Sequence, residues 1–151
     1  DYCSLCGILV QLPGNYGANW IVESKFWKDR KTLITGHTGF KGSWLTVWLE
    51  SLGAKVIGVA LDLPSQPSHF EVADLAKSIE DHRLDIRDGD ELKRLVSGTQ
   101  PDFVFHLAAQ PLVRQSYLDP VETYQTNVLG TLNLLEALRS LKKKMYLRFD
   151  Y

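Results

Sequence analysis

The chain has 151 residues, 44% of them hydrophobic, and its 17 basic and 18 acidic residues leave a formal net charge of −1. This length supports one hydrophobic core, so the sequence predicts a single globular domain or part of one. The balanced charge gives no reason to expect nucleic acid as a partner, and no apolar run is long enough to span a membrane. We therefore expect a cytoplasmic protein.

Residues 1–24 show no regular pattern and are interpreted as an extension of unknown role. Within them, Cys3 and Cys6 have the spacing of a redox pair or of half a zinc site. A zinc site of this kind needs four ligands, and the histidines lie far away in the sequence. We therefore expect two incidental thiols and no metal site.

From Phe26 onward the pattern becomes regular. Residues 31–35 predict a strand, and after three glycines the apolar residues between Leu45 and Leu52 recur at helical spacing, with Gly53 as the stop. Residues 55–61 form a nearly continuous apolar run, which is typical of a strand buried on both faces of a parallel sheet. Together these elements predict a complete βαβ unit.

The rest of the chain alternates helices and strands. Asp88 and Glu91 have the spacing of a capping box, and Asp119 followed by Pro120 predicts another helix start. The predicted elements are a short helix over 70–77, a weak strand over 79–84, a helix over 90–96, a strand over 102–107 and a helix from 120 to about 141. This alternation predicts a doubly wound parallel α/β sheet of the Rossmann type.

The last predicted helix is apolar on more than one side. One stripe consists of Val121, Tyr124, Val128, Leu132 and Leu135, and a second group consists of Leu134, Leu138 and Leu141. Such a helix is expected to bury two sides, of which a sheet covers only one. The second side is left to core packing or to a partner subunit.

The glycines Gly36, Gly39 and Gly42 lie between a predicted strand and a predicted helix. Free N–H groups and the dipole at a helix N-terminus favour an anion, and glycine lets the backbone approach a pyrophosphate closely. Asp62 ends the second strand, where a carboxylate accepts from ribose hydroxyls and repels a 2′-phosphate. The pattern favours NAD over NADP, although such turns also use glycine for steric reasons alone.

Several motifs resemble the extended short-chain dehydrogenase/reductase superfamily, namely the Gly-x-x-Gly-x-x-Gly spacing, an Ala-Ala pair after a strand and Asn127 inside a helix. Within this superfamily, several short sequence segments resemble the CDP-glucose 4,6-dehydratase family over about residues 26–140. The matching segments are 26–27 (FW), 35–45 (TGHTGFKGSWL), 60–62 (ALD), 85–88 (DIRD) and 106–114 (HLAAQPLVR).

This resemblance implies roles for particular residues. The glycine-rich turn would surround the pyrophosphate, Asp62 would hold the adenosine ribose, and Asn127 would help to shape the site. Arg114 would bind the substrate diphosphate. The remaining cofactor positions are Thr38 and Phe40 at the pyrophosphate, Asp85 and Ile86 at the adenine, and Leu107, Ala108, Ala109 and Gln110 at the nicotinamide ribose.

Each role has a simpler alternative. Asp85 would only cap a turn, the alanines would be small because strand and helix pack closely, and Arg114 would form a surface ion pair. His37 and Lys41 are more readily interpreted as a turn histidine and a solvated lysine than as phosphate ligands. His106 lies on an apolar strand, which favours a core histidine over a catalytic base.

The resemblance also implies an activity, the NAD-dependent conversion of CDP-glucose to CDP-4-keto-6-deoxyglucose. Its catalytic Tyr-x-x-x-Lys pair has no match here, because neither Tyr146 nor Tyr151 has a lysine four residues on. We therefore expect residues 25–141 to form a partial NAD-binding domain, inactive alone, that ends after the fourth strand and following helix. That would leave the strand at 102–107 as an exposed edge.

Residues 142–151 are interpreted as a divergent tail, and the three lysines at 142–144 suggest a reading-frame change. Two alternatives remain open for the function: another sugar-nucleotide epimerase or dehydratase of the superfamily, or a non-catalytic NAD-binding module. For the full-length form we expect a nucleotide-sugar substrate and a homo-oligomer.

Overall fold

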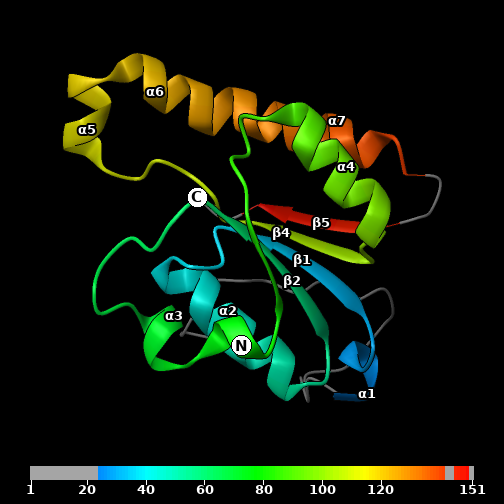
Figure 1. The fold of residues 1–151 in the computed structure, drawn as a ribbon. Helices are drawn as coiled ribbons and strands as arrows, with labels where there is room; N and C mark the ends of the chain where they lie inside the picture. Colours follow the sequence, from blue (N-terminus) through cyan, green and yellow to red (C-terminus); the bar gives the residue numbers. More distant parts are fainter. Residues whose placement is uncertain (1–23, 142–144, 150–151) are drawn as a thin grey trace, which may run out of the picture.

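A parallel sheet forms the centre of the computed structural model, which describes residues 24–141 and 145–149 (Figure 1). Its order is β3-β2-β1-β4-β5, so the chain reverses direction across the sheet between β1 and β4. The strands are β1 (Lys31–Thr35), β2 (Lys55–Ala60), β3 (Glu80–Arg83), β4 (Phe103–His106) and β5 (Tyr146–Phe149). The predicted Rossmann-type doubly wound sheet is confirmed.

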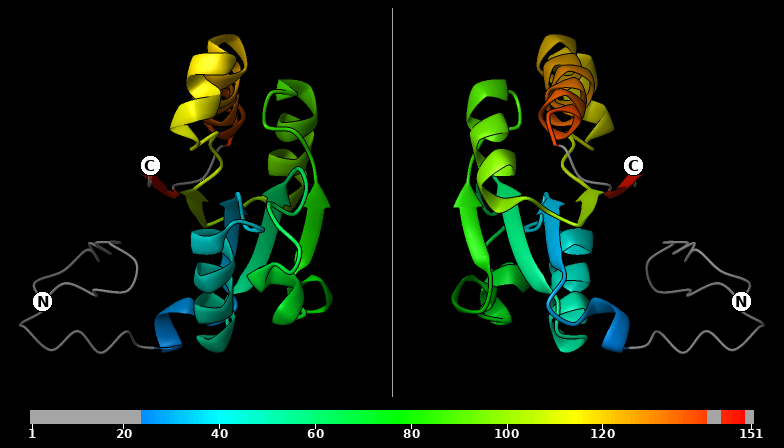
Figure 2. Two further views of the ribbon diagram at one scale, coloured as in Figure 1. Left: turned by 90° about the vertical axis from the view of Figure 1, so that its left-hand side faces the viewer. Right: turned by 90° about the vertical axis from the view of Figure 1, so that its right-hand side faces the viewer.

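Helices cover both faces of this sheet (Figure 2). One face carries α1 (Ser24–Trp27), α2 (Phe40–Ser51) and α3 (His69–Val72), which leads to a 3₁₀ turn at Leu75–Lys77. The other carries α4 (Gly89–Thr99) and α7 (Gly130–Arg139). Neighbouring residues of β1 therefore enter different cores: Leu33 packs with the α4 and α7 side and Ile34 with Trp27 and the α2 side. This explains why β1 and β2 are apolar almost throughout.

The helix ends follow the predicted capping chemistry in part. Asp88 accepts a hydrogen bond from the Glu91 amide at 2.9 Å, which starts α4. The full reciprocal capping box occurs instead at Ser68 and Glu71, at the start of α3, which the sequence reading missed. Asp119 caps the later helix as predicted, accepting from the Glu122 amide at 2.9 Å.

The region after β4 is more divided than predicted. A short helix, α5 (Val113–Leu118), precedes the long one and was not predicted. The long helix itself consists of α6 (Pro120–Tyr124), a π-helical turn at Gln125–Leu129, and α7. Single π turns inside a helix shift the direction of the side chains that follow, and they often mark functional positions.

The expectation of an exposed edge at the fourth strand is wrong. β5 pairs in parallel with β4 and extends the sheet to a fifth strand. Phe103 lies opposite Tyr146, and their rings stack with centroids 5.2 Å apart. Aromatic cross-strand pairs favour strand pairing, so the residues after the lysine run continue the sheet. Residues 142–144 lie outside the described part of the chain, and a divergent origin for the tail stays a prediction.

The two apolar sides of the long helix have different environments. Leu134, Ala137 and Leu138 of α7 are buried. The other stripe is exposed, with exposed fractions from 39% at Leu135 to 69% at Tyr124. Core packing within the described residues therefore does not cover this second side. The helices in the described part of the chain are too short or too polar to cross a membrane.

Candidate functional site

Loops from four strands meet at the carboxyl edge of the sheet (Figure 1). They follow β1, β2, β3 and β4, and they carry nearly all of the residues that the sequence assigned to a cofactor. Because the strands are parallel, these loops lie on the same edge, beside the point where the strand order reverses. In open α/β sheets this switch point is the usual place for a ligand.

Different structural constraints explain the three glycines of the first loop. Gly36 has φ +75°, and a Cβ there would lie 2.8 Å from the Ala108 nitrogen. A Cβ at Gly42 would overlap the Gly36 carbonyl oxygen. At Gly39 the nearest atom would be that same oxygen, at 3.3 Å. The steric alternative thus accounts for Gly36 and Gly42, whereas at Gly39 a Cβ would make a single, milder contact that a small shift relieves.

The N-terminus of α2 lacks a side-chain cap. Its N-cap is Gly39, and its first turn contains no acidic residue. The N-caps of α4 and α6, Asp88 and Asp119, each accept a backbone hydrogen bond and thus occupy part of the anion-binding capacity of their helices. The first turn of α2 is therefore electrostatically open to an anion from outside the chain. Phe40, at its start, is 75% exposed.

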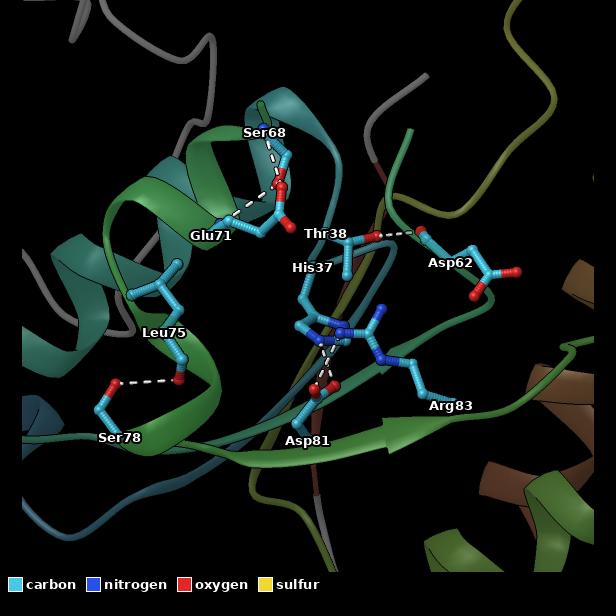
Figure 3. Close-up of polar contacts among 9 residues, drawn as sticks. All are labelled: His37, Thr38, Asp62, Ser68, Glu71, Leu75, Ser78, Asp81 and Arg83. Atoms are coloured by element: carbon cyan, nitrogen blue, oxygen red, sulfur yellow. Dashed lines mark hydrogen bonds and ion pairs between the residues drawn. The ribbon is translucent and has the colours of Figure 1, made fainter. Parts of the chain in front are cut away.

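Thr38 joins the first two loops. Its side chain is buried, and its hydroxyl donates to the Asp62 carbonyl oxygen at 3.0 Å (Figure 3). The Asp62 side chain itself is exposed and has no hydrogen bond or ion pair with the described residues. The loop after β2 is thus held by its backbone, which leaves the carboxylate available to hydroxyl groups of a ligand.

Asp85 is in the opposite situation. Its carboxylate accepts from the Arg87 side chain at 2.6 to 3.0 Å and from the Arg87 amide at 2.9 Å. The hydrogen bond from the Arg87 side chain lowers the pKa of Asp85. This geometry fits the turn-capping alternative. Ile86 is buried against α7, where a Cβ at Gly130 would lie 2.6 Å from its Cδ1 atom.

The loop after β4 is held by hydrogen bonds to the long helix. The Gln110 amide donates to Asn127 Oδ1 at 2.7 Å, and Asn127 Nδ2 donates to the Gln110 carbonyl at 3.1 Å. The Gln110 side chain is engaged within the chain as well, with Thr123 at 3.0 Å and the Leu112 amide at 2.6 Å. Asn127 lies in the π-helical turn. The geometry fits the predicted role of Asn127 in shaping the site, because its side chain binds the Gln110 backbone.

The His37 ring points toward Asp81 of β3 (Figure 3). Its Nε2 lies 2.8 Å from Asp81 Oδ1 on β3, and its ring packs against Gly58 and the edge of Phe70. Burial lowers the pKa of His37, and the effects of Asp81 and of the Val59 carbonyl oppose this only in part. Nδ1 has no hydrogen-bond partner among the described residues. The reading of His37 as a structural histidine is in line with this position.

His106 is a core histidine, as its apolar strand suggested. It is 2% exposed, and both ring nitrogens have hydroxyl partners, on Thr35 at 2.6 Å and on Thr131 at 2.9 Å. Burial lowers the pKa of His106 to about 4. Leu107, Ala108 and Ala109 follow directly and are partly buried. No sequence signal singled out either threonine, since a hydroxyl next to a strand has many possible partners.

Arg114 is not brought into this site. It lies on α5, which projects beyond the sheet (Figure 1), and it is exposed without an ion pair to the described residues. Metal binding is not supported either, because the described residues contain no group of three or more His, Cys, Asp or Glu side chains that suits an ion. Cys3 and Cys6 lie outside the described residues.

An open cavity of about 510 Å³ lies at the opposite edge of the sheet, between β3 and α4. Its lining includes Lys31, Glu80 and Arg94, which are at the amino ends of the strands or on α4. Side chains of both signs line it, and apart from Leu84, which directly follows β3, its lining lies outside the loops described above. The arrangement of glycine turn, open helix terminus and free carboxylate is found at the carboxyl edge.

Comparison with known proteins identifies the family. The family model for GDP-mannose 4,6 dehydratase matches residues 33–150, which includes β5. CDP-glucose 4,6-dehydratase of Salmonella typhimurium is 50% identical over 79% of this chain and 33% of its own length. A GDP-mannose 4,6-dehydratase of Sordaria araneosa is 38% identical over 81% of this chain and 22% of its own. The chain thus spans about a third or less of these relatives.

Solved structures agree with this assignment. UDP-glucose 4-epimerase of Thermus thermophilus, in complex with NAD, has a TM-score of 0.64 and 36% identity over 72% of this chain and 33% of its own. The Bordetella bronchiseptica enzyme WbmF, in complex with NAD⁺ and UDP, has a TM-score of 0.68 and 26% identity over 83% and 36%. The resemblance to CDP-glucose 4,6-dehydratases is confirmed, and the chain belongs to the GDP-mannose 4,6 dehydratase family.

Proposed function

We propose that this chain supplies the NAD-binding part of a sugar-nucleotide 4,6-dehydratase. The observation that carries the proposal is the combination of an uncapped α2 N-terminus with the Asp62 carboxylate, which has no partner among the described residues, on the same edge of the sheet. The first suits a pyrophosphate and the second suits ribose hydroxyls. Gly39 leaves room for the close approach that a pyrophosphate needs. The residues present therefore fit a dinucleotide.

Within this proposal each loop has a task. Residues 36–42 hold the pyrophosphate, Asp62 binds the adenosine ribose, the backbone at Ile86 lies beside the adenine, and residues 107–110 line the nicotinamide ribose. Bound NAD supplies a hydride acceptor that is regenerated when the hydride returns to the sugar. Asp85, tied to Arg87, and Asn127, tied to Gln110, keep the shape of the loops.

We propose CDP-glucose as the substrate of the full-length protein. The support is the 50% identity to a CDP-glucose 4,6-dehydratase, against 38% to a GDP-mannose 4,6-dehydratase and 36% to a UDP-glucose 4-epimerase. Another epimerase or dehydratase activity is the alternative. The full-length protein incubated with NAD and with CDP-, GDP-, dTDP- and UDP-sugars separates them: preferred formation of 4-keto product from another nucleotide sugar would overturn the assignment.

We also propose that this chain does not catalyse the dehydration alone. Its sequence has no Tyr-x-x-x-Lys pair after β4. The chain incubated with CDP-glucose and NAD should form no 4-keto product, while it still binds NAD. Sustained turnover would contradict this, and NAD binding without turnover is also what a non-catalytic NAD-binding module would show.

Asp62→Asn tests the cofactor site. The variant keeps the size of the side chain and removes its charge, so NAD affinity measured by calorimetry should fall by about 10- to 100-fold, the value of a charge-assisted hydrogen bond. Discrimination against NADP should weaken as well, because a carboxylate repels a 2′-phosphate. Asp90→Asn, at an exposed carboxylate on α4, is the matched control and should leave both affinities unchanged. Equal NAD affinity in the two variants would contradict the proposed role.

We propose in addition that the full-length protein associates with a second copy through the exposed stripe of the long helix. Val121, Tyr124, Val128 and Leu132 are each at least half exposed and lie along one side of this helix. A continuous apolar stripe of this kind usually marks an interface. Sedimentation of the full-length protein should give a dimer or larger species, which Leu132→Lys should weaken; a monomer at micromolar concentration would contradict the interface.

A further inference from the structure

A buried chain of hydrogen bonds runs through His106 across the candidate site. His106 is the last residue of β4, and Thr35 is the last residue of the adjacent β1. The ring joins Thr35, through Nδ1 at 2.6 Å, to Thr131 of α7, through Nε2 at 2.9 Å. It therefore connects two strand ends to the helix that covers them.

The direction of each bond follows from counting protons. The Thr131 hydroxyl has one proton and donates it to the Asn127 carbonyl at 2.7 Å, so toward His106 it can only accept. Nε2 must then carry a ring proton. The Thr35 hydroxyl oxygen already accepts from two backbone amides, so its own proton is left for Nδ1, which must accept it. The ring is accordingly neutral. The lowering of the pKa of His106 by burial agrees with this state at neutral pH.

The far end of the chain is the backbone of the loop after β4. The Thr35 hydroxyl oxygen accepts from the amides of Leu107 at 3.2 Å and Ala108 at 3.3 Å, and the Leu107 amide also donates to the Thr35 carbonyl oxygen at 3.0 Å. The same helical segment holds the other end of this loop, because Asn127 binds the Gln110 backbone. The loop that is assigned to the nicotinamide ribose is thus fixed at both ends by side chains.

We propose that His106, neutral and protonated at Nε2, is a positioning residue that holds the Leu107 and Ala108 backbone in place for the nicotinamide end of the cofactor. This inference rests on the proposed NAD site. His106 does not face the ligand in this account. It acts through Thr35, whose hydroxyl transmits the position of the ring to the two amides.

The ring state is tested by nitrogen NMR of the chain labelled at histidine. The expected spectrum at neutral pH shows a neutral His106 with the proton on Nε2. A proton on Nδ1, or a charged ring, would overturn the proposal. This measurement needs no ligand, so it can be made even if the chain does not bind NAD. A failure to bind NAD would refute the proposed function. The spectrum would still test the hydrogen-bond chain.

The positioning role is tested by removing one link at a time. His106→Phe and Thr35→Val should accelerate hydrogen exchange at the Ala108 amide and weaken NAD binding by roughly tenfold, about the contribution of one lost hydrogen bond. Thr35→Ser keeps the hydroxyl and should restore both values. If the effect of Thr35→Val came from lost stability alone, Thr35→Ser would not restore the two values, because it also loses the methyl group.

Thr32 provides a matched control on the same strand. It is fully buried in β1, but its hydroxyl has no hydrogen-bond partner in the described residues. Thr32→Val should leave exchange at Ala108 and NAD affinity unchanged. If Thr35→Val behaves like Thr32→Val in a chain that binds NAD, His106 does not position the loop and the proposal is overturned.

Discussion

The two walls of the candidate site are held in different ways. The wall around residues 36–42 depends on backbone packing, where Gly36 and Gly42 allow close approach and a helix terminus stays uncapped. The wall at residues 107–110 depends on side-chain hydrogen bonds from Thr35, His106 and Asn127. The first kind of wall leaves a local pattern in the sequence. The second joins residues that are distant in the chain and leaves none.

Gly42→Ala should break the first wall and have the largest effect. The new methyl group would overlap the Gly36 carbonyl and lie 2.7 Å from the His37 Cα atom. Because both are backbone atoms, the overlap cannot be relieved by a rotamer change, and the free energy of unfolding should fall by about 3 kcal/mol. Urea unfolding followed by circular dichroism measures this.

Gly39→Ala is the control for that experiment. A Cβ there has one near neighbour, the Gly36 carbonyl oxygen at 3.3 Å, and the residue is an N-cap with φ −69°. The free energy of unfolding should change by about 1 kcal/mol or less. NAD affinity should fall nevertheless, since the methyl group occupies the approach to the helix terminus. Equal stability of the two variants would show that the glycines are not distinguished by packing.

The next largest effect is expected from acid, which should destabilise the chain through His106 of the second wall. The pKa of His106 is about 4 in the folded chain and 6.5 in the unfolded chain, so at intermediate pH only the unfolded chain takes up the proton. Stability is then complete above about pH 6.5 and falls by about 3 kcal/mol as pH drops toward 4. The lowered pKa of His37 acts in the same direction.

Urea unfolding at about pH 7 and at about pH 4.5 measures this loss. His106→Phe removes the titrating ring, so its stability should depend less on pH over this interval than that of the unaltered chain. The same pH dependence in both proteins would mean that His106 is not held neutral by burial, and the second wall would lose its central residue.

Asn127→Ala should destabilise the chain less than Gly42→Ala or acid does. It removes two hydrogen bonds to the Gln110 backbone, which predicts a loss of about 1 to 2 kcal/mol. Asn133 offers a matched control, because its Nδ2 binds the carbonyls of Ile86 and Arg87 on the neighbouring loop. Hydrogen exchange at the Gln110 amide should accelerate in Asn127→Ala only. Acceleration in both variants would indicate general loosening.

The parts of the fold that were predicted from sequence have strong local signals. The apolar runs at 31–35 and 55–61, and the capping aspartates Asp88 and Asp119, gave the strands and helix starts that the structure shows. β5 was missed because a four-residue strand next to a lysine run has little periodicity. α5 was missed because Val113–Leu118 follows a loop without a capping side chain.

The candidate site was predictable to the same extent. The glycine turn and Asp62 follow a spacing that backbone geometry imposes, and the structure places them on one edge of the sheet. The pairing of Asp85 with Arg87 and of Gln110 with Asn127 depends on rotamers and on the π-helical turn, which no local pattern encodes. The contact between Thr35 and His106 spans 71 residues and requires the assembled sheet.

A titration of the isotopically labelled chain with NAD, followed by amide NMR, tests the central claim most directly. The account predicts that shifts concentrate on residues 36–42, on Asp62 and on residues 107–110, the loops of the carboxyl edge. Shifts confined to the cavity at the amino edge, near Lys31, Glu80 and Arg94, or no shifts at all in the folded chain, would contradict it.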